Sequence, residues 1–135
     1  MEKDLALYIL INKDINISSG KMPGQVGHAI FRYITSEKGK EDKHLQEFLD
    51  MNDNDRRIIT LGCPLSRLES LEQEGYPAQR DLGLTELPPN TLTTLCYGVL
   101  DRTERIEGYN NSYIVSEVPK WLKRLRLYKN TSERW

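Results

Sequence analysis

The chain of 135 residues has few cysteines and no long apolar run, so it lacks the features of a disulfide-rich or membrane-spanning protein. Its two cysteines, Cys63 and Cys96, cannot form a disulfide framework and lack the spacing of zinc ligands. No apolar run approaches the roughly 20 residues that cross a bilayer, and the charged N-terminal residues predict neither a signal peptide nor a transit peptide. Apolar residues make up 38% of the chain, enough for one core. We therefore expect one cytoplasmic domain over residues 1–135 that binds no membrane, with a mitochondrial location left open.

The net charge of −1 hides an uneven distribution of charged residues. Residues 119–135 carry six Lys or Arg against one Glu, so the other 118 residues sum to −6. A total near zero argues against a non-specific nucleic-acid binder, whereas a basic segment on an acidic body can contact a polyanion. A solvated helix face with a frayed tail after residue 130 explains the same charges. Lys120, Lys123 and Arg124 are the candidate contacts if a polyanion binds.

Apolar spacing predicts alternating strands and helices. The expected order is a strand over residues 5–11 that is buried on both faces, helices over 22–38 and 43–51, a strand over 57–61, a helix from Pro64 to Gly75, an extended piece over 76–81, a strand over 91–99, a helix over 116–123 and a short strand over 125–128. Residues 101–112 are polar and predict a loop, which we interpret as an insertion. Helices that separate strands favour an α/β sandwich of three layers around a mixed sheet.

The first candidate site lies at residues 20–28, where a loop leads into a predicted helix. Lys21 stands at the helix N-terminus, where the positive end of the dipole usually attracts Asp or Glu. Free N–H groups, a lysine and neighbouring glycines suit a phosphate or a carboxylate. A solvated lysine beside a flexible loop is the alternative. His28 lies within the helix and is expected to pack in the core, whereas His44 lies in a charged stretch and is expected to be exposed.

The second candidate site follows the extended piece over 76–81. Asp81 stands at its end, where α/β sheets commonly build sites, and Arg80 precedes it. Thr91 and Thr93 are two residues apart on a predicted strand and so should share one face. A carboxylate and hydroxyl groups can hold and activate a water molecule. The alternative is an ordinary turn, because Asp and Gly favour turns and Thr favours strands.

These segments together resemble the type 2 peptidyl-tRNA hydrolase family, which occurs in archaea and eukaryotes. The family's Gly-Lys-x-x-x-Gln-x-x-His-Ala helix start corresponds to residues 20–29, and its Arg-Asp-x-Gly-x-Thr motif to residues 80–85. Its Pro-Gly-Thr-x-Thr motif corresponds to residues 89–93, with Asn90 in place of Gly, an exchange that is tolerated because Asn accepts positive φ. Residues 121–128 resemble the family's closing helix and strand, so the similarity spans nearly the whole chain.

The resemblance implies a mainly four-stranded mixed sheet flanked by helices, a homodimer, and hydrolysis of the ester between peptide and tRNA in peptidyl-tRNA. It implies no metal and no organic cofactor. Carried over by position, the catalytic residues are Lys21, Asp81, Thr85 and Thr93, with Gln25, His28, Arg80 and Thr91 as further substrate-binding residues. Asp81, with Thr85 or Thr93, would orient the attacking water, while Lys21 would stabilise negative charge or bind the terminal phosphate.

Two other functions stay open at this point. Leu84 and Glu86 replace the family's Arg and Gln, which favours a tRNA- or protein-binding module with weak or no catalysis. A different small-molecule hydrolase or transferase on the same scaffold is the third reading. If tRNA binds, Lys21 and Arg80 should share a surface with the basic C-terminal residues.

Overall fold

The computed structural model describes residues 2–83 and 87–129. Its main sheet contains four strands in the order β2-β1-β4-β3. Strand β1 (Leu5–Asn12) pairs in parallel with β2 (Arg57–Cys63). It pairs antiparallel with β4 (Leu92–Asp101), which in turn pairs antiparallel with β3 (Ala78–Arg80). This arrangement confirms the predicted mixed sheet of four strands.

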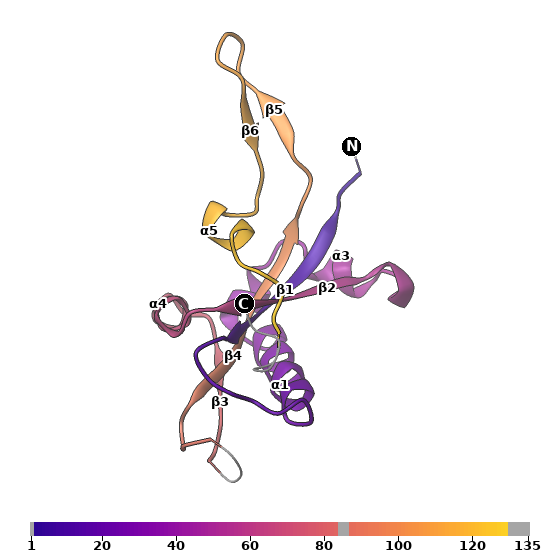
Figure 1. Cartoon of the computed structure of the whole chain (residues 1–135). Helices are drawn as coiled ribbons and strands as arrows, with labels where there is room; N and C mark the ends of the chain where they lie inside the picture. Colours follow the sequence, from indigo (N-terminus) through magenta and orange to yellow (C-terminus); the bar gives the residue numbers. More distant parts are fainter. Residues whose placement is uncertain (1, 84–86, 130–135) are drawn as a thin grey trace.

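Helices cover both faces of this sheet and form a three-layer sandwich (Figure 1). All eight residues of β1 are buried, and residues 5–11, for which we predicted burial on both faces, alternate between two apolar clusters. One cluster joins β1 to α1 (Met22–Ile34) and to α3 (Leu45–Leu49). The other joins it to α4 (Leu65–Gln73) and α5 (Lys120–Lys123). No helix among the described residues is long and apolar enough to span a bilayer.

Three helices are shorter than predicted, and one of them, expected over 116–123, is only α5 (Lys120–Lys123). The helix expected over 22–38 ends at Ile34, and α2 (Glu37–Lys40) follows as a separate turn. Ser36 separates them, because its Oγ accepts a hydrogen bond from Gly39 N at 3.1 Å and caps α2. The helix expected over 43–51 is reduced to α3, and a 3₁₀ turn at Asp53–Asp55 precedes β2.

The C-terminal segment extends the sheet beyond β2. Tyr128 N donates to Thr60 O at 2.9 Å, and Gly62 N donates to Arg126 O at 2.9 Å. Leu127 forms an isolated antiparallel bridge with Leu61. The strand predicted over 125–128 is therefore present as a short ladder that covers the outer edge of β2. The frayed tail predicted after residue 130 lies outside the described residues.

The loop predicted over 101–112 is wrong in part. Strand β4 continues to Asp101, and β5 (Arg105–Glu107) lies inside the predicted loop. It pairs antiparallel with β6 (Tyr113–Val115) in a separate hairpin. This hairpin projects from the body of the molecule (Figure 1). The sequence did not predict these strands because each is only three residues long, too short for an alternating apolar pattern to be recognised.

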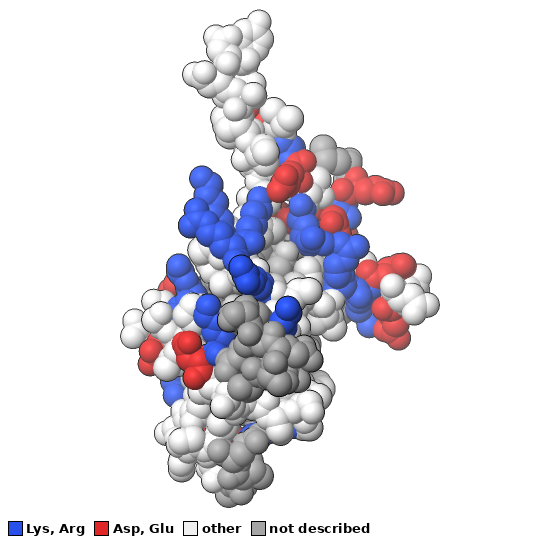
Figure 2. Space-filling model, in the orientation of Figure 1, with Lys and Arg blue, Asp and Glu red and all other residues white. Residues whose placement is uncertain are grey.

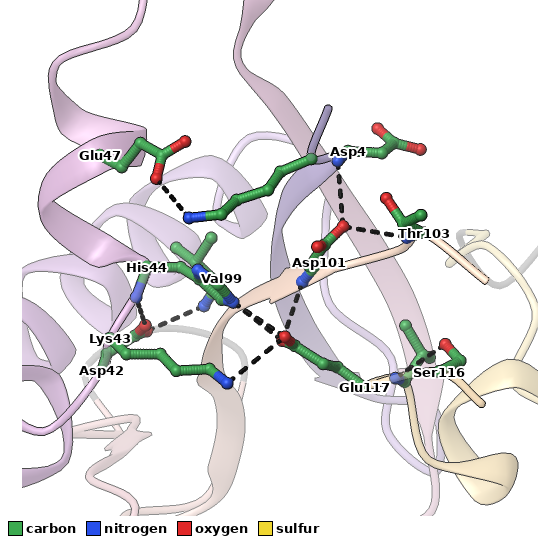
Figure 3. A network of polar contacts seen from close by, with 12 residues as sticks. Asp4, Asp42, Lys43, His44, Glu47, Val99, Asp101, Thr103, Ser116 and Glu117 are labelled. Atoms are coloured by element: carbon green, nitrogen blue, oxygen red, sulfur yellow. Dashed lines mark hydrogen bonds and ion pairs between the residues drawn. The ribbon is translucent and has the colours of Figure 1, made fainter. Parts of the chain in front are cut away.

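Along part of β4, side-chain carboxylates accept the backbone hydrogen bonds that a neighbouring strand would otherwise accept (Figure 3). Strand β3 is so short that the C-terminal half of β4 has an uncovered outer edge. There Asp42 Oδ2 accepts from Val99 N at 2.9 Å, and Glu117 Oε1 accepts from Asp101 N at 3.2 Å. His44, which we expected to be exposed, is buried with Nε2 at 3.0 Å from Glu117 Oε1. Asp42 and His44 therefore fold onto the sheet edge, whereas Lys40, Glu41 and Lys43 around them face solvent.

Gly98 provides a test of this packing, since it has φ +107° and a Cβ there would lie 2.2 Å from Tyr33 Oη. We expect Gly98→Ala to lower the free energy of unfolding by about 2–4 kcal/mol, from strain and overpacking together. Gly27→Ala is the matched control, because Gly27 lies in α1 with nothing within 4 Å of its added Cβ. It should stabilise the protein by up to about 1 kcal/mol. Urea denaturation measures both, and equal effects would contradict the packing described.

Candidate active site

One end of the sheet gathers both sequence-predicted segments. Strands β1 and β3 end there and β4 begins there, because β4 runs antiparallel to both. The buried Asn12 ties these strands together, since its Nδ2 donates to Leu92 O at 2.8 Å. Its Oδ1 accepts from Asp14 N at 2.9 Å and so starts the loop that leads to α1. Sequence reasoning missed Asn12, although a polar residue ending an apolar strand was the available signal.

Lys21 and Asp81 meet at this end of the sheet. Lys21 occupies the N-cap position of α1, and its Nζ lies 2.6 Å from Asp81 Oδ1. The exposed fractions of the two side chains are 17% and 4%. The carboxylate of Asp81 explains a lysine at the positive end of a helix dipole, because it supplies the negative charge that Asp or Glu would otherwise bring. The first and the second candidate sites of the sequence thus meet in one ion pair.

The second oxygen of Asp81 is also engaged. Oδ2 accepts a hydrogen bond from Gly83 N at 2.8 Å. The hydrogen bond from Lys21 lowers the pKa of Asp81 below its ordinary value, and the Gly83 N–H adds to this effect while burial opposes it. The carboxylate is therefore ionised at neutral pH and held in one orientation.

The loop that carries Asp81 closes on itself. Asp81 N donates to Thr91 O at 2.8 Å, and Asn90 N donates to Asp81 O at 2.7 Å. Asn90 has φ 66°, which confirms that Asn accepts the positive φ for which the family uses Gly. Gly83 has φ +79°, and a Cβ there would lie 2.7 Å from Pro89. The loop thus needs Gly at 83 and Asn or Gly at 90 to present the carboxylate.

The two predicted threonines do not share a strand face. Strand β4 begins at Leu92, so Thr91 lies in the preceding turn, where its Oγ1 donates to Pro88 O at 2.7 Å. Thr93 is fully buried in a bulge of β4, and its hydroxyl lies 2.5 Å from Gln25 Oε1 and 3.1 Å from Gln79 O. Thr93 therefore reaches α1 through Gln25 and has no access to solvent.

The basic candidates divide between the two faces of the sheet. Arg80 pairs with Glu72 of α4 at 2.6 Å and donates to Asn90 O at 2.8 Å, so it braces the Asp81 loop from the α4 side. Lys21 begins α1 on the opposite face. The structure does not bring the α5 residues Lys120, Lys123 and Arg124 into contact with the Lys21–Asp81 pair. Lys123 instead pairs with Glu104 at 3.0 Å.

Lys and Arg side chains gather over the face where α5 lies (Figure 2). The guanidinium of Arg67 stacks on the Trp121 ring at 4.5 Å, and both residues line a cavity of about 450 Å³ with Arg124. This surface is built from α4 and α5, which pack on the same side of the sheet. Lys21 begins the helix on the opposite face of the sheet, so this surface does not include all five of the predicted basic residues.

Two further candidates have different outcomes. His28 is exposed on α1, so its predicted place in the core is wrong. The buried residues of α1 are Gln25, Ala29 and Tyr33, which recur every four residues and leave His28 off the stripe. Thr85 lies outside the described residues. Leu82, beside Asp81, is 78% exposed, and no pattern in the sequence marked it.

The thiols do not offer an alternative nucleophile. Burial raises the pKa of both Cys63 and Cys96 to about 12, so both are neutral at physiological pH. Within residues 2–83 and 87–129, no group of three or more His, Cys, Asp or Glu residues is arranged to hold a metal ion. The ionised carboxylate, the ammonium group and the N-terminus of α1 can orient a water molecule and stabilise a developing oxyanion.

Comparisons with a family model and with individual proteins all find peptidyl-tRNA hydrolases. A model of the family described as peptidyl-tRNA hydrolase PTH2 matches residues 5–108. A peptidyl-tRNA hydrolase from Pyrobaculum aerophilum is 32% identical over 103 residues, covering 70% of this chain and 84% of its own. One from Methanocaldococcus jannaschii is 28% identical over 109 residues, covering 76% and 92%. One from Staphylothermus marinus is 33% identical over 97 residues, covering 67% and 78%.

The lowered pKa of Asp81 predicts how acid affects stability. The carboxyl group of the unfolded chain titrates near 3.8, and that of the folded chain titrates lower. The unfolded state therefore binds more protons between these values, and stability falls as the pH drops through the folded pKa. We expect the unfolding free energy of the wild type, minus that of Asp81→Asn, to be constant near neutral pH and to fall below about pH 4. A difference that rises on acidification would contradict the ion pair.

The bond between Thr93 and Gln25 predicts a separate loss of stability. Thr93→Val keeps the side-chain shape but leaves the Gln25 amide oxygen without its donor. We expect the free energy of unfolding to fall by about 1–3 kcal/mol. Thr91→Val is the matched control, because Thr91 is half-buried and its side-chain hydroxyl donates only to Pro88 O within its own turn. Thermal and urea unfolding of the two variants should rank Thr93→Val as the less stable.

Proposed function

The chain belongs to the peptidyl-tRNA hydrolase PTH2 family, and we propose that it hydrolyses the ester between peptide and tRNA with Lys21 and Asp81 as catalytic residues. The observation that carries this assignment is their 2.6 Å contact at the N-terminus of α1. A nearly buried carboxylate and an ammonium group are otherwise costly to hold together. Their position at the common end of β1, β3 and β4 supports a role in chemistry.

Asp81 orients the attacking water in this mechanism. Its two oxygens are held by Lys21 and by Gly83 N, so the carboxylate direction is set before substrate arrives. The lowered pKa makes Asp81 a weak base while Lys21 is in contact. When the ammonium group turns toward the substrate, that contact weakens and the basicity of Asp81 rises. Asp81 can then accept the proton of water as it adds to the ester carbonyl. The tetrahedral intermediate collapses by breaking the bond to the ribose oxygen, which takes that proton from Asp81, so that the peptide leaves as a carboxylic acid and the tRNA with a free hydroxyl.

Lys21 stabilises the negative charge that develops on the carbonyl oxygen. It stands at the positive end of the α1 dipole, so the ammonium group and the helix act on the same anion. The same position suits the terminal phosphate of tRNA. Gln25, anchored by Thr93, fixes the first turn of α1 relative to β4. Thr93 is thus a positioning residue, and Thr85 is the remaining candidate for contact with the water.

The substrate extends beyond the reacting ester. His28 and Thr91 lie on the two segments that flank the ion pair, and Arg80 holds the Asp81 loop. The basic residues Lys120, Lys123 and Arg124 would bind backbone phosphates of the tRNA, which makes affinity depend on salt. A substrate produced by translation agrees with a cytoplasmic location, and we also propose that the protein forms a homodimer.

Single-turnover release of peptide from peptidyl-tRNA tests the catalytic pair. We expect Lys21→Ala and Asp81→Asn each to slow release about a hundredfold or more, because each removes an oriented group that acts in the transition state. Lys40→Ala is the matched control, since Lys40 is an exposed lysine that pairs only with Glu37 one turn away. It should release peptide at the wild-type rate.

The same assay separates hydrolysis from binding alone. Folded Lys21→Ala that keeps the wild-type rate would refute the role of that lysine. Wild-type protein that binds peptidyl-tRNA without releasing peptide would favour the binding module. Binding by Asp81→Asn at wild-type affinity, with release lost, supports the enzyme.

A further inference from the structure

The β5–β6 hairpin exposes apolar side chains that nothing in the described chain covers. The exposed fractions are 75% for Ile106, 64% for Ile114, 57% for Tyr113 and 98% for Tyr109. Ile106 and Ile114 are directly opposite each other, so both project from the same face of the hairpin. A two-stranded hairpin is at best marginally stable in water by itself, and exposed apolar clusters commonly mark interfaces. The hairpin therefore has the character of a docking element.

The position of the hairpin separates it from catalysis. It follows the C-terminal end of β4, whereas the Lys21–Asp81 pair lies where β4 begins. Residues 102–115 contain two Arg and two Glu, so this segment has no net charge. A neutral, apolar arm does not favour a polyanion such as tRNA. Its occupant should instead be a protein surface with matching apolar groups and charges.

The charge pattern of β5 is complementary to itself. Arg105 and Glu107 flank Ile106, and across β6 they meet only Val115 and Tyr113. Without opposite charges across the strands, they pair with each other along β5 at 2.8 Å. If two copies of β5 pair antiparallel about a two-fold axis at Ile106, Arg105 of each copy faces Glu107 of the other. Opposite charges in such positions stabilise strand pairs, and like charges destabilise them.

We propose that the β5–β6 hairpin is a homodimerisation arm, in which β5 pairs with β5 of a second copy of this chain. The two hairpins then form one four-stranded sheet in the order β6-β5-β5-β6. Its apolar face carries a continuous row of four isoleucines, Ile114 and Ile106 from each copy, and the unpaired edge of β5 is covered. This names the surface of the homodimer proposed above and rests on that proposal.

The size of the contact sets its strength. Strands of three residues bury little area compared with the roughly 1,200–2,000 Å² of stable complexes. The dimer is therefore reversible and depends on protein concentration. Isologous pairing also closes after two copies through this edge of the arm.

Charge exchange on the full chain provides the sharpest test, with sedimentation equilibrium as the measurement. Arg105→Glu and Glu107→Arg each place like charges opposite one another twice per dimer. Each should raise the dissociation constant about tenfold or more. An equimolar mixture of the two single variants should form a heterodimer with near wild-type affinity. The double variant Arg105→Glu/Glu107→Arg should also recover dimerisation, because its pattern is again complementary to itself.

Cross-linking tests the register independently. Ile106→Cys places two thiols on the two-fold axis, where opposite Cβ atoms in an antiparallel pair are within about 5.5 Å. Mild oxidation should give a covalent dimer on a non-reducing gel. Ile114→Cys is the matched control and should not cross-link, whereas pairing through β6 would reverse the two results. The native Cys63 and Cys96 are buried and do not interfere.

These experiments distinguish failure of the homodimerisation arm from failure of the homodimer or of the proposed hydrolase. Wild-type protein that stays monomeric at all concentrations overturns both the arm and the homodimer. A dimer that is unaffected by either single charge variant, or that cross-links through Cys at 114, overturns the arm alone. Arg105→Glu should release peptide from peptidyl-tRNA at the wild-type rate, because the hairpin lies far along β4 from the ion pair. Absence of release in the wild type refutes the enzyme and leaves the arm to its own test.

Discussion

Burial of β1 on both faces is the constraint from which the rest of the structure follows. Its seven apolar residues alternate between the two apolar clusters, so helices must cover the sheet on each side. Because β1 pairs with β2 on one edge and with β4 on the other, its carboxyl end lies beside the start of β4 and the end of β3. Asn12 closes this junction with a buried hydrogen bond to Leu92 O. The candidate active site lies where these strand ends meet.

At that junction lie the opposite charges of Lys21 and Asp81, and burial of either charge without the other would be unfavourable. Asp81 is nearly buried, and without Lys21 and Gly83 N its ionised form would lose most of its compensation. Lys21 stands at the positive end of a helix and needs a nearby anion for the same reason. Each charge compensates for the burial of the other, so an ionised carboxylate lies beside an ammonium group before any substrate binds.

The two ends of β4 have different tasks. At its start, a bulge, the Asp81 loop and the bond from Thr93 to Gln25 hold the groups that we propose to be catalytic. Beyond the short β3, the edge of β4 is protected by Asp42 and Glu117, the second of which also binds His44 and Lys43 (Figure 3). This network anchors the base of the hairpin on the body of the molecule. The hairpin is thus attached at the opposite end of β4 from the Lys21–Asp81 pair.

Local patterns in the sequence determined the main elements and pointed to both halves of the site. The apolar run of β1, the four-residue stripe of α1 and the turn residues around Asp81 are properties of neighbouring residues, and they predicted strand, helix and loop correctly. They could not place His28 or His44, because burial depends on which helix face meets the sheet. Nor could they show that Thr93 bonds to Gln25 across 68 positions, or that α5 packs away from Lys21. Those contacts join residues that only strand pairing and layer packing bring together, so the tertiary structure alone decided them.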